Sequence, residues 1–101
     1  MPIWRLTPID LKDRNWDAST HRGEVVVRAP TERIARSAAS LCFAIATRVV
    51  PGEKIKFTPW RHADLVKAER IESGKWSEDG PISILDPEGH DEELESVNFE
   101  D

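Results

Sequence analysis

The 101-residue sequence contains one cysteine, Cys42, and no tyrosine. A single cysteine cannot form a disulfide within the chain, which argues against the disulfide-stabilised class of small secreted domains. No apolar run approaches the roughly 18 residues that a membrane-spanning helix needs. The first ten residues, MPIWRLTPID, lack the basic region and apolar stretch of a secretory signal. We therefore expect a cytoplasmic protein that does not cross a membrane.

Recognisable catalytic and cofactor motifs are also missing. The three histidines, His21, His62 and His90, are isolated in sequence, with neither an i,i+4 pair nor a Cys-x-x-Cys motif nearby. The five glycines stand singly, so no phosphate-binding loop is present. Ser19 lies close to His21, but no acid that would orient a catalytic triad can be identified. The sequence thus predicts no catalytic residue, no metal ligand and no cofactor, although an unfamiliar enzyme remains open.

The longest regular pattern predicts a helix over residues 31–49. Thr31 can cap its first turn, and Pro51 after two β-branched valines ends it. On a helical wheel a stripe about 100° wide is apolar, as expected for a helix with one face against a core. The residues of this stripe are Ile34, Ala38, Leu41, Cys42, Ile45 and Val49.

Next to this stripe the helix carries further apolar residues, so its apolar arc is wider than contact with one sheet requires. Two explanations are open: loops of the same chain cover the flank, or it forms a homodimer or partner surface anchored by an aromatic side chain. The tryptophans of the flanking loops could cover this flank or form part of the partner surface. The predicted partner-binding residues are Phe43, Ala39, Ala35, Ala46, Trp16 and Trp60.

Strands are predicted on both sides of the helix, from alternation or from runs of β-branched residues. Residues 63–72 are compatible with helix or strand, and we interpret 65–71 as a strand. The sequence predicts an α+β fold of order β-β-α-β-β, with one long helix on a small antiparallel sheet. Residues 1–85 form a single domain, and 86–101 form a disordered acidic tail. The other predicted strands are 3–9, which ends at Pro8 or runs along an edge, 24–29 and 81–85, while residues 54–57 are a short alternating stretch outside this order.

Charge is unevenly distributed. Residues 86–101 contain eight acidic residues and no lysine or arginine. Removing these from the total of 19 acidic residues leaves 11 against 14 basic ones in residues 1–85. The tail is then either a solubilising segment or one that binds a basic groove and so imitates nucleic acid. A basic helix face of Arg33, Arg36 and Arg48 supports the alternative of a nucleic-acid-associated protein.

Three segments, WRLTPIDLKDRNWDAST, GEVVVRAPTERIARSAA and ATRVVPGEKI, resemble those of short bacterial proteins that have no assigned activity. The resemblance implies a bacterial cytoplasmic protein and supplies no catalytic residue. Together with the residue patterns it favours a small protein-interaction or regulatory module that has a protein partner or forms a homodimer. The alternatives are the nucleic-acid-associated protein above and a small-molecule-binding domain or enzyme with a pocket lined by His21, Trp16 or Trp60.

Overall fold

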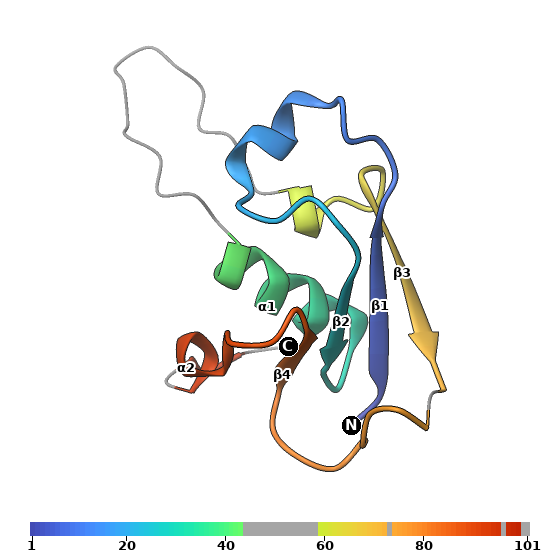
Figure 1. Ribbon diagram of the computed structural model, residues 1–101, viewed down its shortest axis with the longest axis vertical. Coiled ribbons are helices and arrows are strands. Elements are labelled where there is room, and N and C mark those ends of the chain that lie inside the picture. The colour runs from blue at the N-terminus through green and yellow to red at the C-terminus, as the bar shows by residue number, and fades with distance from the viewer. Residues whose placement is uncertain (44–58, 73, 96, 100–101) are drawn as a thin grey trace.

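The computed structural model describes residues 1–43, 59–72, 74–95 and 97–99. Four strands, β1 (Ile3–Pro8), β2 (Val25–Arg28), β3 (Val66–Ile71) and β4 (Ser83–Asp86), form one antiparallel sheet of order β3-β1-β2-β4. The main helix, α1 (Glu32–Phe43), packs on β1, β2 and β4 (Figure 1). The predicted α+β character, an antiparallel sheet with one main helix, is confirmed. The short alternating stretch 54–57 lies outside the described residues.

The inner strands follow directly from the sequence. Val25, Val26 and Val27 are at most 2 % exposed, because β2 lies between β1 and β4 and is covered on both faces. β1 is also an inner strand, so the alternative that it runs along an edge is wrong. It ends at Pro8, whose missing N–H cannot extend the ladder. The ambiguous segment 65–71 forms the edge strand β3, as predicted.

Helix α1 begins as its sequence predicts. The Thr31 hydroxyl accepts a hydrogen bond from the Ile34 backbone N–H at 3.2 Å, which satisfies one of the free donors of the first turn. The buried face is turned relative to the predicted stripe, since Leu41 is 46 % exposed whereas Ala35 and Ala39 are fully buried. Residues 44–49 of the predicted helix lie outside the described residues.

Two short 3₁₀ helices lie at the flank of α1 that the sequence left open, the second in sequence packing on α1 and the first packing on the second. These are η1 (Arg14–Ala18) and η2 (Pro59–Arg61), which contact each other and carry Trp16 and Trp60. Both indole rings are fully buried, at a centroid distance of 5.2 Å and nearly perpendicular to each other. The explanation in which the chain covers its own helix is therefore the one that the structure shows.

The C-terminal segment differs from the predicted disordered tail. Its short helix α2 (Asp91–Leu94) packs on α1 and β4, and Leu94 is only 6 % exposed within the main hydrophobic core. The Ser83 hydroxyl donates a hydrogen bond to the Asp91 carboxylate, which ties the start of α2 to β4. The acidic composition suggested disorder because few residues here are apolar. Leu94 nevertheless provides one buried anchor, and Phe99 packs partly against the same core.

We predict that Leu94→Ala lowers the free energy of unfolding by about 2 kcal/mol, because it removes a buried side chain and leaves a cavity. Urea denaturation measures this, with Val97→Ala as the matched control. Val97 is 36 % exposed, so its truncation should change stability by less than about 0.5 kcal/mol. Equal stability of the wild type and Leu94→Ala would mean that the segment does not dock on the body.

Candidate functional site

The predicted partner surface is not exposed in the structure. Phe43 is 1 % exposed, and Ala35, Ala39, Trp16 and Trp60 are 0 % exposed. In the described part of the chain these side chains therefore form no exposed docking surface, because the aromatic residues pack against one another inside the molecule. Phe43 has ring contacts with His21 at 5.0 Å, Trp60 at 5.7 Å and His90 at 4.9 Å between centroids. Ala46 lies outside the described residues.

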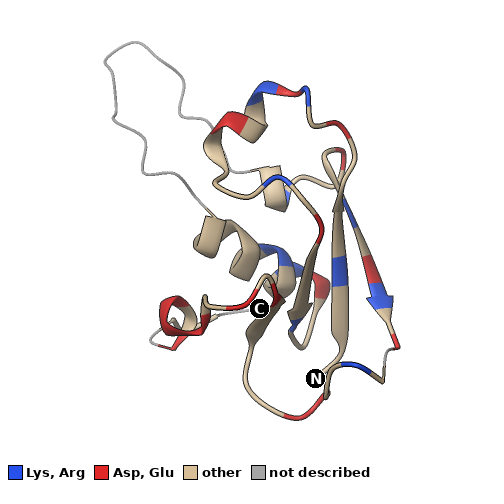
Figure 2. Cartoon of the chain, in the orientation of Figure 1, with Lys and Arg blue, Asp and Glu red and all other residues tan. Residues whose placement is uncertain are grey.

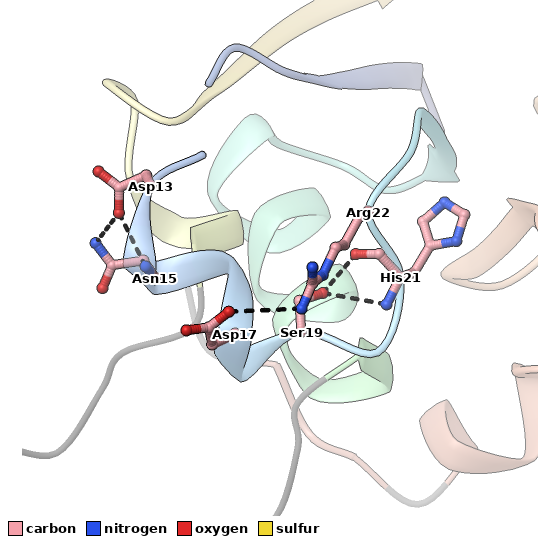
Figure 3. Close-up of polar contacts among 6 residues, drawn as sticks. All are labelled: Asp13, Asn15, Asp17, Ser19, His21 and Arg22. Carbon is pink, nitrogen blue, oxygen red and sulfur yellow. Dashed lines mark hydrogen bonds and ion pairs between the residues drawn. The ribbon is translucent and has the colours of Figure 1, made fainter. Parts of the chain in front are cut away.

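Ser19 and His21 have structural roles in the loop after η1. The Ser19 hydroxyl donates to the His21 carbonyl at 2.6 Å and accepts from the Trp60 indole N–H at 2.9 Å. The His21 ring instead points to the Glu24 carbonyl, with Nε2 at 3.2 Å from it. Figure 3 shows the Ser19 contacts to the His21 backbone, with the imidazole directed away. This arrangement holds the loop and does not present a hydroxyl activated by an imidazole. Because Trp16 and Trp60 are fully buried, they do not line an open ligand pocket either.

The arginines of the predicted basic face do not share one environment. Arg36 is only 8 % exposed, and its guanidinium donates to the carbonyls of Trp60 at 3.3 Å and Val66 at 2.9 Å. Its Nε lies 3.5 Å from the Glu32 carboxylate, so its charge is balanced within the fold. The guanidinium thus joins α1 to η2 and β3. It is therefore wrong to count Arg36 as a phosphate-binding residue. Arg33 is exposed as predicted, and Arg48 lies outside the described residues.

A groove of about 500 Å³ lies between β4 and the C-terminal segment. Its apolar lining comes from both sides, and Met1 and Val97 are exposed there. The Asp91 and Glu95 carboxylates stand on the α2 side, while Arg28 on the other side is held by hydrogen bonds to the carbonyls of Pro81 and Ser77. The lining residues are Met1, Arg28, Pro81, Ile82, Ser83, Asp91, Leu94, Glu95, Val97 and Phe99.

The surroundings of this groove are strongly acidic. Figure 2 shows acidic residues along α2 and at the end of β4, with no basic residue on this segment. The acidic side chains of this segment that the structure describes are exposed, whereas the apolar Leu94 among them is buried. The segment therefore presents negative charge to solvent from an anchored position. The exposed acids are Asp86, Glu88, Asp91, Glu92, Glu93 and Glu95.

A cluster of three different donor groups lies where α1 ends against α2. The donor atoms of Cys42, His90 and Glu93 all lie within 4.8 Å of one another. Burial raises the pKa of the Cys42 thiol to about 12, reinforced by a hydrogen bond and charge repulsion from Glu93 and by the charge of Asp91. Without a bound cation the thiol is therefore protonated at neutral pH and is a poor nucleophile.

Sequence reasoning missed both the groove and this cluster. The apolar positions Leu94, Val97 and Phe99 are visible in the sequence, but nothing there shows that they fold back on β4. His90 and Glu93 are three residues apart, a spacing that places both on one helix face. That spacing is a usable local signal. Cys42 lies 48 residues before His90 in the sequence and comes close to both residues only because α2 packs on α1.

The comparisons with known proteins add no family or function. No protein-family model, no curated protein and no solved structure matches the chain. In the part of the chain that the structure describes, no helix has the length and apolar character needed to span a bilayer.

We predict that the Cys42 thiol reacts slowly with iodoacetamide. With a pKa of about 12 only about one thiol in ten thousand is ionised at pH 8, against roughly one in ten at the ordinary thiol pKa of 9.0. In metal-free buffer, alkylation of the folded chain should be at least about 100-fold slower than alkylation in guanidinium, as followed by mass spectrometry. Similar rates in both conditions would show that the thiol is neither buried nor affected by Glu93.

Proposed function

We propose that this protein is a non-catalytic interaction module whose groove between β4 and the C-terminal segment binds a basic, partly apolar segment of a partner protein. The single observation that carries the proposal is an apolar groove with the acidic residues Asp91 and Glu95 on the α2 side, opposite Arg28, whose guanidinium is held by the carbonyls of Pro81 and Ser77. Residues 1–85 and the anchored C-terminal segment act as one unit in this proposal. A reducing, cytoplasmic setting fits the free Cys42.

The groove can recognise two features of a ligand at once. Ile82 and Phe99 offer partly exposed apolar area packed against the hydrophobic core that contains Leu94, so an apolar side chain can be desolvated there. The carboxylates of Asp91 and Glu95 lie beside it and attract lysine or arginine side chains. A segment of alternating or amphipathic character would place an apolar residue in the groove and a cation against α2.

The charge distribution also favours this class of partner over nucleic acid. Phosphate groups would meet the exposed acids of the C-terminal segment, and Arg36 is committed to carbonyls inside the fold. Self-association through two copies of the groove would bring like charges together, which costs binding energy. A second copy of this chain is therefore a poorer occupant than a basic segment of a different protein.

A selection from a random peptide library tests the groove. We predict that enriched peptides combine an apolar residue with lysine or arginine, and that their affinity falls as the salt concentration rises. Glu95→Lys should weaken these peptides by about tenfold, or about 1.4 kcal/mol, because it reverses a charge at the groove. Fluorescence anisotropy with one labelled enriched peptide measures the change.

Glu72→Lys is the matched control, since Glu72 is an exposed acid at the end of the edge strand β3, outside the groove. It changes the net charge of the protein by the same amount and should leave peptide affinity unaltered. Val97→Glu should reduce affinity by introducing a charge at the apolar lining. Enrichment of acidic peptides, or equal loss of binding in Glu95→Lys and Glu72→Lys, would overturn the proposal.

A further inference from the structure

We propose that Cys42, His90 and Glu93 bind a divalent transition-metal ion, with Zn²⁺ as the cation that fits the donor set best. A thiolate, an imidazole and a carboxylate are the three ligand types that zinc uses in proteins. This mixture of soft, intermediate and hard donors suits neither Mg²⁺ nor Ca²⁺, which take oxygen ligands. The inference does not rest on the proposed peptide groove.

The distances between the donor atoms are close to those of a tetrahedral site. His90 Nδ1 and the Glu93 carboxylate oxygen are 3.3 Å apart. Tetrahedral ligands about 2.0 Å from zinc are about 3.3 Å from each other, so the separation of this pair already matches one edge of such a site. The Cys42 sulfur lies within 4.8 Å of both donors, and a shift of about 1 Å would bring it to the edge length of about 3.5 Å that a longer zinc–sulfur bond requires.

The three donors are also held from different directions. Cys42 is in the last turn of α1, whereas His90 immediately precedes α2 and Glu93 lies within it. The His90 ring packs edge-on against buried Phe43, which fixes its position beside the end of α1. The Cys42 sulfur is 4.0 Å from the His90 carbonyl oxygen. A metal ion here would cross-link α1 to α2 and leave its fourth position for water or another small ligand.

Local charge favours a cation at this point. The carboxylates of Glu93 and Asp91 both lie near the half-buried Cys42 thiol. A divalent ion would replace the thiol proton and neutralise the carboxylate charge. Asp91 itself is engaged with the Ser83 hydroxyl and therefore supports the position of α2 without being needed as a ligand.

Titration of the full-length, reduced protein with Co²⁺ tests the site, because cobalt–thiolate coordination gives a charge-transfer absorption in the near ultraviolet. Cys42 is the single cysteine, so any such absorption reports its thiolate directly. We expect saturation at one Co²⁺ per chain and loss of the absorption when Zn²⁺ is added. Cys42→Ser should abolish the absorption, while His90→Gln and Glu93→Gln should each weaken Co²⁺ binding at least tenfold.

His62→Gln is the control, since it removes an exposed histidine outside the cluster and should leave the titration unchanged. Circular dichroism of each variant verifies that it is folded before titration. In addition, Zn²⁺ should raise the Tm of the wild type and fail to raise that of Cys42→Ser. The proposal is overturned by the absence of a cobalt–thiolate absorption at saturating Co²⁺, by one metal per two chains, or by equal effects of His62→Gln and His90→Gln.

Discussion

The packing of Phe43 at the end of α1 determines how the remaining segments are arranged. Its ring contacts His21 from the loop after η1, Trp60 from η2 and His90 from the start of the C-terminal segment. Three segments far apart in sequence are therefore held at one buried aromatic side chain. The indole N–H of Trp60 and the Ser19 hydroxyl satisfy each other within this cluster, so burial leaves neither of these groups without a partner.

Because of this packing the apolar flank of α1 is buried, and the apolar groove lies elsewhere, beside the C-terminal segment. With η2 packed on α1 and the alanine-rich flank buried, that flank cannot act as a docking face. The C-terminal segment is drawn onto α1 and β4, where its single buried leucine anchors a row of exposed carboxylates. The groove and the Cys42, His90 and Glu93 cluster both arise from this one docking event, on two sides of α2.

The parts that sequence predicted well depend on local rules. Three consecutive valines specify an inner strand, and Thr31 specifies the first turn of α1, because both effects act within a few residues. The helical wheel identified an apolar arc but placed Leu41 in the core, since a wheel does not show from which side other segments approach. Arg36 was assigned to solvent because its carbonyl partners are 24 and 30 residues away.

The candidate site could not be predicted for the same reason. The acidic composition of residues 86–101 predicts disorder because it averages over the whole segment. One buried leucine, Leu94, is nevertheless enough to fix a short helix on an existing core. The Phe43 ring, which the sequence predicts as the anchor of a partner surface, instead contacts His21, Trp60 and His90 of the same chain. Contacts between residues far apart in sequence determine what packs against Phe43 and where Leu94 docks.

Proton nuclear Overhauser contacts of the Phe43 ring test the central claim most directly. The account predicts contacts from Phe43 to the ring protons of both His21 and His90 in the full-length chain, given centroid distances of 5.0 and 4.9 Å. Contacts to His21 without any to His90, with His90 showing the averaged chemical shifts of a free segment, would contradict it.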